Sequence, residues 1–322
     1  MMTLFSKTSI GWLAGLAMAS SCLMAQAEEP TPIRIGWVNW SDTEIAVKLA
    51  DTALRDHLKQ PVKLVLADIG IQFQALANGS IDLIPMVWLP STHKSFYDKY
   101  KDKLEDLGSL YEGRIGMAVP TSIPTTEIAS VEDLNKPEVR EKLGGKILTS
   151  EVGNGQYKLT EKAIKEYKLD GYKMVASSES GMLSELDRNL KRDKWSLINA
   201  WSPHWMFSKW SLRYLDDPKQ IFGGAEQIHA VARQGFSAEH PDVARFFANF
   251  KIPQADLEKL MATARDSSAD KVVAEYYAAN KPRFEAMFGN QGPPRQPLSH
   301  DCGCPPGLPG GRDQFLWVLL DE

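Results

Sequence analysis

From residue 32 onward, short apolar runs alternate with amphipathic stretches of helical period, and this alternation restricts the fold more than any other feature. Residues 33–40 and 62–67 have the length of strands. Residues 41–58 have the length and spacing of a helix that opens on a capping-box sequence, SDTE. Alternation of this kind predicts βαβ units and a largely parallel sheet. We therefore expect an α/β protein.

Two apolar segments interrupt the alternation and predict a division into two lobes. Residues 113–120 (GRIGMAVP) have the pattern of a strand that leaves the first lobe, and residues 228–231 that of a strand that returns. Residues 28–117 together with 228–290 are then expected to form lobe 1, and residues 118–227 lobe 2. Two such lobes, each a mainly parallel sheet flanked by helices, with a ligand cleft between them, correspond to a type II periplasmic binding protein fold.

The length of 322 residues suits two domains of ordinary size. A hydrophobic content of 43% and a charged content of 24% are typical of globular proteins. The formal net charge is −4, and no long basic run is present. Nucleic-acid binders usually carry a clustered basic face, so we expect no nucleic-acid partner.

Residues 1–27 have the pattern of a signal peptide. Lys7 precedes an apolar stretch over residues 10–18, and residues 25–27 (AQA) resemble a cleavage site. Cys22 leaves a lipoprotein as the alternative, although the residues before it lack the leucine that such sites favour. No other stretch reaches the roughly 18 apolar residues of a membrane span. We therefore expect an exported protein that is soluble in the periplasm.

The composition changes near the carboxyl terminus. Residues 291–322 are rich in Pro and Gly and carry no periodic pattern, which predicts a disordered tail. The two cysteines of this tail, Cys302 and Cys304, provide no disulfide framework for the lobes. Because the chain also lacks HExxH and paired CxxC motifs, we expect neither a metal nor a cofactor.

Three tryptophans stand at the ends of three apolar runs: Trp40, Trp88 and Trp201. Ligands of open α/β sheets bind outside the carboxyl ends of the parallel strands, so these positions should face a cleft. Several indole faces in one cleft suit a cation without N–H groups, such as a quaternary ammonium. Core packing is the competing interpretation, and we prefer it for the remaining tryptophans of the lobes, namely Trp37, Trp195, Trp205 and Trp210.

The turn GNGQ, residues 153–156, is the second candidate element. Its glycines allow a close backbone approach, and the helix that follows directs free N–H groups at an anion. The amides of Gly155 and Gln156 are well placed to hold a carboxylate, although a glycine turn can also serve strand-to-helix geometry alone. His93, shortly after Trp88, offers a further donor or is a structural residue.

Three long segments of the chain carry a family resemblance: VNWSDTEIAV, MVWLPSTHKSFYDKY and AWSPHWMFSKWSLRYLDDPKQIFGGAEQIHAVARQGFS. With these segments the chain resembles the substrate-binding proteins of quaternary-ammonium ABC importers, the glycine betaine/choline-binding family. The resemblance spans residues 32–288, and the tail has no counterpart in it. It implies a membrane permease with its ATPase as partners, and we expect the protein itself to be monomeric.

The resemblance also implies roles for particular residues. Trp40, Trp88 and Trp201 match the aromatic prism that surrounds the methylated cation. Gly155 and Gln156 match the backbone amides that bind the carboxylate of a betaine, and His93 matches its side-chain donor.

Choline-specific members of the family resemble the chain at a related set of positions: Trp40, Asp42, Trp88, Asn154 and Trp201. They carry an additional aromatic residue where this chain has Ile115, and they lack the counterpart of His93. Both differences favour a ligand with a carboxylate. Asp42 keeps choline open, because a carboxylate can hold a hydroxyl group or complement the cation.

The resemblance therefore predicts capture of glycine betaine or a related betaine, such as carnitine or proline betaine, for delivery to an ABC permease. A choline-preferring protein of the same class and a receptor that presents the ligand to a sensor are alternatives. An enzyme acting on a choline ester would need an activated nucleophile. The chain has no GxSxG elbow, no cysteine within the predicted lobes and no metal motif, so we expect no enzymatic activity.

Overall fold

The computed structural model describes residues 30–289 of the chain. The predicted signal peptide, residues 1–27, and the predicted tail, residues 291–322, lie outside this range, as do all three cysteines. Within residues 30–289, no helix has the length and apolar character needed to cross a membrane.

The described residues contain nine strands that are hydrogen-bonded in the order β2-β1-β3-β9-β4-β7-β5-β6, with β8 also paired to β4. β1 pairs in parallel with β2 and β3, and β5 pairs in parallel with β6 and β7. Every pair that involves β4 or β9 is antiparallel. The strands are β1 (Ile33–Trp37), β2 (Val62–Leu66), β3 (Leu83–Leu89), β4 (Leu104–Pro120), β5 (Lys146–Thr149), β6 (Lys173–Ala176), β7 (Ile198–Ser202), β8 (Leu212–Tyr214) and β9 (Glu226–Arg233).

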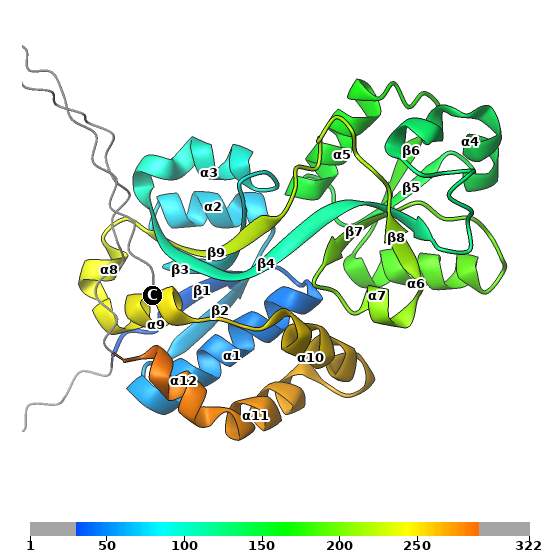
Figure 1. The fold of residues 1–322 in the computed structure, drawn as a ribbon. Helices are drawn as coiled ribbons and strands as arrows, with labels where there is room; N and C mark the ends of the chain where they lie inside the picture. Colours follow the sequence, from blue (N-terminus) through cyan, green and yellow to red (C-terminus); the bar gives the residue numbers. More distant parts are fainter. Residues whose placement is uncertain (1–29, 290–322) are drawn as a thin grey trace, which may run out of the picture. The chain divides into compact units, whose positions relative to one another are not determined.

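β4 is the strand that joins the two halves of the sheet. Residues 104–113 of this strand pair with β9, whereas residues 114–118 pair with β7 and residues 118–120 with β8. In Figure 1, β4 runs as one continuous ribbon from the half-sheet of β1–β3 into that of β5–β8. We call the first half with its helices lobe 1 and the second half lobe 2.

These observations confirm the α/β fold class. The helix-connected strands of each lobe pair in parallel, as expected. The crossing strands β4 and β9 add antiparallel pairs, so each lobe is a mixed sheet. The predicted lobe boundaries, after residue 117 and before residue 228, fall inside β4 and β9. β4 changes its partner between residues 113 and 114. Residues 114–117, which the sequence assigns to lobe 1, therefore pair with β7 of lobe 2.

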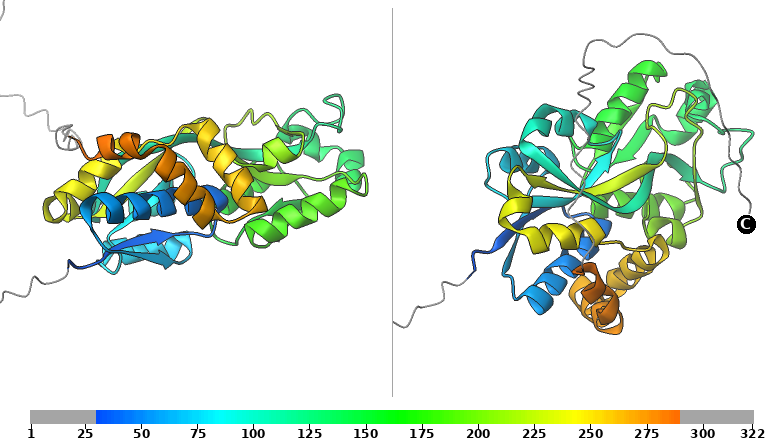
Figure 2. Two further views of the ribbon diagram at one scale, coloured as in Figure 1. Left: turned by 90° about the horizontal axis from the view of Figure 1, so that it is seen from below. Right: turned by 60° about the vertical axis from the view of Figure 1, so that its left-hand side comes forward.

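Helices cover both faces of each half-sheet. In lobe 1, α2 and α3 lie on one face, and α1 with α10, α11 and α12 lie on the other (Figures 1 and 2). In lobe 2, α5 lies on the opposite side of the strands from α6 and α7 (Figure 1). The α-helices are α1 (Ser41–Leu58), α2 (Ile69–Ala77), α3 (Lys94–Tyr100), α4 (Pro137–Leu143), α5 (Gly155–Glu166), α6 (Glu179–Leu190), α7 (Met206–Lys209), α8 (Phe236–Glu239), α9 (Pro241–Asn249), α10 (Gln254–Asp266), α11 (Ala269–Ala279) and α12 (Lys281–Met287), and short 3-10 helices span Lys101–Lys103 and Val131–Asn135.

The start of α1 differs from the predicted capping box. The N-cap residue is Trp40, which makes no side-chain cap, and Ser41 is already the first helical residue. The hydroxyl of Ser41 instead donates a hydrogen bond to Glu179, which opens α6 in lobe 2. The prediction of a capping box is therefore wrong, because the Ser41 hydroxyl bonds to a distant carboxylate and not to the backbone at the start of its own helix.

Candidate functional site

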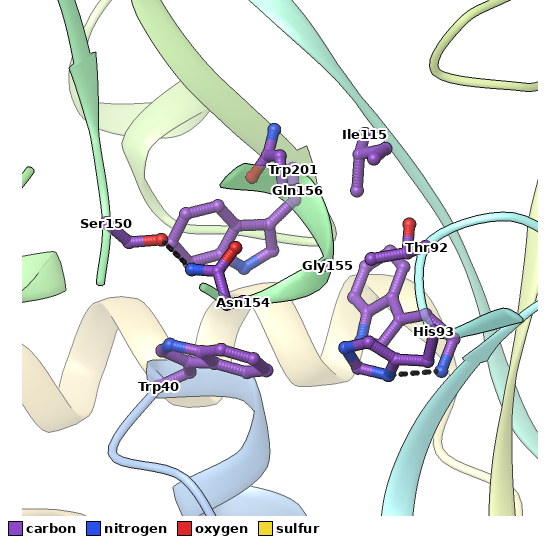
Figure 3. Close-up of a pocket in the computed structure, with 10 residues that line it drawn as sticks. Trp40, Thr92, His93, Ile115, Ser150, Asn154, Gly155, Gln156 and Trp201 are labelled. Atoms are coloured by element: carbon purple, nitrogen blue, oxygen red, sulfur yellow. Dashed lines mark hydrogen bonds between the residues drawn. The ribbon is translucent and has the colours of Figure 1, made fainter. Parts of the chain in front are cut away.

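A cavity between the two lobes gathers most of the predicted site residues (Figure 3). Its empty volume, which includes space open to solvent, is about 340 Å³. Lobe 1 and β4 contribute Trp40, Trp88, Thr92, His93 and Ile115, and lobe 2 contributes Ser150, Asn154, Gly155, Gln156 and Trp201. Seven of the eight predicted binding residues are in this lining, and the eighth, Asp42, is not.

The three predicted tryptophans reach the cavity from three separate strands. Trp40 follows β1, Trp88 lies in β3, and Trp201 lies in β7 next to Ile115 of β4. Trp88 and Trp201 are buried, with relative exposures of 3% and 6%. Because β3 and β7 belong to different lobes, the aromatic walls come together only when the lobes are arranged as they are in this structure.

Each indole is held by a specific neighbour. The Nε1–H of Trp40 donates to Glu151 of lobe 2 over 3.0 Å, which also places a negative charge beside the ring. The Trp201 and His204 rings pack nearly at right angles, with an interplanar angle of 80° and centroids 4.7 Å apart. The Trp88 ring packs on Gly113, where a Cβ atom would lie 2.5 Å from Cζ3 of the indole. Glycine at position 113 is therefore required for this ring position.

The amino end of α5 forms the opposite wall. The side chain of Asn154 caps the helix by accepting the N–H of Tyr157 over 2.7 Å, and its Nδ2 donates to Ser150 Oγ (Figure 3). The amides of Gly155 and Gln156, at the first two helical positions, have no intrahelical acceptor. No acceptor for them is found within residues 30–289. These amides are available to an anion in the cavity.

Gly155 also sets how closely the lobes approach each other. A Cβ atom at this position would lie 2.2 Å from the carbonyl oxygen of Thr92 and 2.9 Å from Cδ2 of His93. The side chain of Gln156 donates to the carbonyl of Ala200 over 2.9 Å, and so it braces α5 against β7. The GNGQ turn thus provides both free amides and a close contact with lobe 1.

The protonation state of His93 follows from its surroundings. Nδ1 accepts the backbone N–H of Trp88 over 3.0 Å, so the proton of the neutral ring is on Nε2 (Figure 3). Burial, with a smaller contribution from nearby Lys158, lowers the pKa of His93 to about 3. The ring therefore remains a neutral donor at every physiological pH.

Thr92 and Ser150 line the cavity but were missed by the sequence analysis. Oγ1 of Thr92 is buried, and the hydroxyl lies close enough to the Glu226 carboxyl group to counteract the rise of its pKa on burial. The backbone N–H groups of Thr92 and Ser91 donate to Glu226 over 2.7 and 3.1 Å, which fixes the turn after β3. Ser150 directly follows β5, so the strand-end rule that selected the tryptophans applied to it as well.

Asp42 lies outside the cavity lining. Its side chain is fully buried, and Oδ2 accepts a hydrogen bond from the hydroxyl of Tyr111 over 2.7 Å. The pKa of Asp42 is raised to about 6, mainly by burial and to a smaller extent by Glu179, while the bond from Tyr111 acts in the opposite direction. One oxygen of the carboxylate expected to hold a choline hydroxyl group is thus engaged by a phenol of its own protein, and the other, Oδ1, is buried without a partner among the described residues.

None of the ten residues that line the cavity carries a full charge, because His93 is neutral. The cavity instead has aromatic faces and a set of neutral donors: two free amides, the Nε2–H of His93 and the hydroxyl group of Ser150. In addition, no cluster of three or more His, Cys, Asp or Glu residues that suits a metal ion occurs within residues 30–289. The arrangement can bind a small molecule that has a bulky cationic end and an anionic end.

Comparison with known proteins places the chain in a family. Residues 31–280 match the OpuAC family, the substrate binding domain of ABC-type glycine betaine transport systems. The chain therefore belongs to this family of substrate-binding proteins, which are not enzymes. This finding confirms the resemblance seen in the sequence.

Individual relatives agree with this assignment. Lactococcal OpuAC, solved in its closed-liganded conformation with glycine betaine, is 28% identical, with a TM-score of 0.74 over 80% of this chain and 100% of that chain. The glycine betaine, L-proline-binding protein ProX from Borrelia burgdorferi is 30% identical, with the same TM-score and coverage. The glycine betaine/carnitine transport binding protein GbuC of Listeria monocytogenes is 32% identical over 149 residues, 46% of this chain and 50% of GbuC. This match thus spans about half the length of its curated relative.

The burial of Asp42 predicts a pH-dependent effect of Asp42→Asn on stability. Because the pKa in the folded protein, about 6, lies above the ordinary value of 3.8, ionisation of Asp42 opposes folding as the pH rises between these values. We expect Asp42→Asn to raise the free energy of unfolding by about 2 kcal/mol at pH 8 and by much less at pH 4. Urea unfolding at both pH values measures this, with exposed Asp98→Asn as the control. A gain of equal size at both pH values would contradict the assignment.

Proposed function

We propose that the protein captures glycine betaine, or a related betaine such as carnitine or proline betaine, in the cavity between its lobes. It then delivers the ligand from the periplasm to the permease of an ABC importer, which is driven by its ATPase. The proposal rests on family membership together with the composition of the cavity wall. The names of the relatives, which refer to glycine betaine, carnitine and proline, point to the same class of ligand.

The uncharged lining is the single observation that carries the proposal. A betaine has a permanent positive charge and a carboxylate in one molecule, so its net charge is zero and it needs no buried counter-charge. The indole faces of Trp40, Trp88 and Trp201 suit the methylated ammonium, which has no N–H group to donate. The neutral donors suit the carboxylate, since hydrogen bonds to a charged acceptor are the strong ones.

The magnitudes are adequate for a useful receptor. Each cation–π contact contributes about 0.5–2 kcal/mol, towards the upper end when the cation is desolvated. Hydrogen bonds to a charged group add about 1.5–3 kcal/mol each. Three indoles and the amides of Gly155 and Gln156 can therefore approach the roughly 8 kcal/mol of a micromolar complex after the costs of association.

Choline fits this cavity less well than a betaine does. It carries a net positive charge, and no carboxylate is present among the residues of the lining. Its hydroxyl oxygen accepts at most two hydrogen bonds, so at least one of the three donors formed by the two α5 amides and the Nε2–H of His93 would remain without a partner, and buried donors without acceptors are costly. Asp42, the one acid that the sequence offered for the hydroxyl group, is bonded to Tyr111.

The aromatic wall is tested by calorimetric titration of the purified protein with glycine betaine, carnitine and choline. The parent protein is expected to bind a betaine at micromolar concentration, well ahead of choline. Trp40→Ala and Trp201→Ala should each weaken binding by at least severalfold, since each removes one face of the cation site. Trp195→Ala is the matched control, because Trp195 lies outside the cavity. Wild-type affinity in both cavity variants would overturn the assignment.

The donor role of His93 has its own signature. His93→Ala should weaken glycine betaine binding by about tenfold or more, through the loss of a hydrogen bond to a charged group, while choline binding changes little. Because the pKa of His93 is about 3, the affinity of the parent protein for glycine betaine should be constant from pH 5 to pH 8. A loss of affinity that follows a titration near pH 6.5, and that persists in Asp42→Asn, would show that the ring is not a fixed neutral donor. Titrations at several pH values distinguish the two results.

A further inference from the structure

A carboxylate away from the cavity bridges the two lobes. Glu179 is the first residue of α6 in lobe 2, and it is buried, with a relative exposure of 6%. It accepts two hydrogen bonds from Ser41, the first residue of α1 in lobe 1. The backbone N–H of Ser41 donates to Oε2 over 2.9 Å, and the hydroxyl of Ser41 donates to Oε1.

Two further donors complete this bridge. Nδ1 of His204 accepts the N–H of Met206 over 2.9 Å, so its Nε2 carries the proton and donates to Glu179 Oε1 over 3.1 Å. The Nε1–H of Trp205 donates to Ser41 Oγ over 3.2 Å. Both carboxylate oxygens of Glu179 therefore accept hydrogen bonds. Ser41 donates to them from the opposite lobe, and His204 donates from the same lobe.

The surroundings of Glu179 favour its charged form. Burial raises the pKa of the carboxyl group, but the hydrogen bonds from His204 and Ser41 more than offset it, so the pKa is lowered overall. The carboxylate also lies at the amino end of two helices, α6 and α1, where a negative charge is stabilised. An ionised acid thus sits at the contact between the lobes.

The bridge is coupled to two walls of the cavity without being part of it. Ser41 directly follows Trp40, and the ring of His204 packs against the ring of Trp201. Ser41, Glu179, His204 and Trp205 are all absent from the cavity lining. Three of them, Ser41, Glu179 and Trp205, line a second and wider hollow between the lobes. The segment after Trp40 is joined to the segment after Trp201 through Glu179 and also by the direct bond from Trp205 to Ser41.

We propose that Glu179 is a positioning residue for ligand binding. By joining Ser41 to His204, it holds the lobes in the arrangement that places Trp40 and Trp201 around one ligand, and it raises affinity without touching that ligand. The inference rests on the proposed function, because it concerns the same cavity. The role of Glu179 differs from the roles of His93 and the α5 amides. Glu179 acts on the arrangement of the lobes, whereas His93 and the amides act on the carboxylate of the ligand.

The test compares Glu179→Gln and Glu179→Ala with the parent protein and with Glu185→Gln. Glu185 lies on the same helix, and its partner is Arg188 within the same lobe, which makes it a matched control. Calorimetry at 15 °C, on variants whose circular dichroism spectra match that of the parent, is expected to give affinities for glycine betaine and for choline reduced by the same factor, about tenfold for Glu179→Ala. Ser41→Ala should reduce affinity by a smaller factor, because its backbone N–H still donates to Glu179. The double variant should lose no more than Glu179→Ala alone.

Three results separate this role from its competitors. A Glu179→Ala variant that melts at a lower temperature but binds both ligands like the parent overturns the proposal in favour of a purely structural role. Losses that simply multiply in the Ser41/Glu179 double variant overturn the bridge. If the parent itself binds neither ligand, the proposed function fails, and X-ray scattering then tests the bridge alone. A larger radius of gyration for Glu179→Ala than for the parent supports the bridge, and an equal radius overturns it.

Discussion

The pairing of β4 with strands of both lobes is the constraint on which the site depends. A single strand that pairs with β9 over its first part and with β7 and β8 over its last part fixes where the two half-sheets meet. The segments after β1, β3, β5 and β7 then converge on one cavity from two lobes. Close packing completes the arrangement, with Gly113 beneath the Trp88 ring and Gly155 against Thr92. The chemistry of the wall follows from these positions.

Much of the fold could be predicted from the sequence, because the responsible signals are local. The period of apolar residues located α1 with the bounds that the structure has, and the strand expected over residues 62–67 is β2, Val62–Leu66. The strand-end rule placed Trp40, Trp88 and Trp201 at a common edge, and the GNGQ turn indicated the start of α5. These predictions needed only the period of a segment and the residue at its end. The binding roles of these residues remain predictions.

The remainder depends on contacts between distant parts of the chain, which no local pattern encodes. Ser41 has the sequence context of a helix cap, yet its hydroxyl donates to Glu179, 138 positions further along the chain. Asp42 has the context of a ligand-binding acid, yet Tyr111 of β4 bonds it within the buried interior. Thr92 owes its place in the cavity to the turn that Glu226 holds. In each case, the partner that decides the role lies on another element.

The central claim is that aromatic faces recognise a positive charge and not merely a bulky group. The direct test is a calorimetric comparison of glycine betaine with 3,3-dimethylbutanoate, which has the same shape and carboxylate but carbon in place of the quaternary nitrogen. If three indoles interact with the charge, glycine betaine should bind at least tenfold more tightly, since even weak contacts of about 0.5 kcal/mol each sum to that ratio. Equal affinities for the two ligands would mean that the cavity selects shape alone, and recognition of the cation by the three indoles would be contradicted.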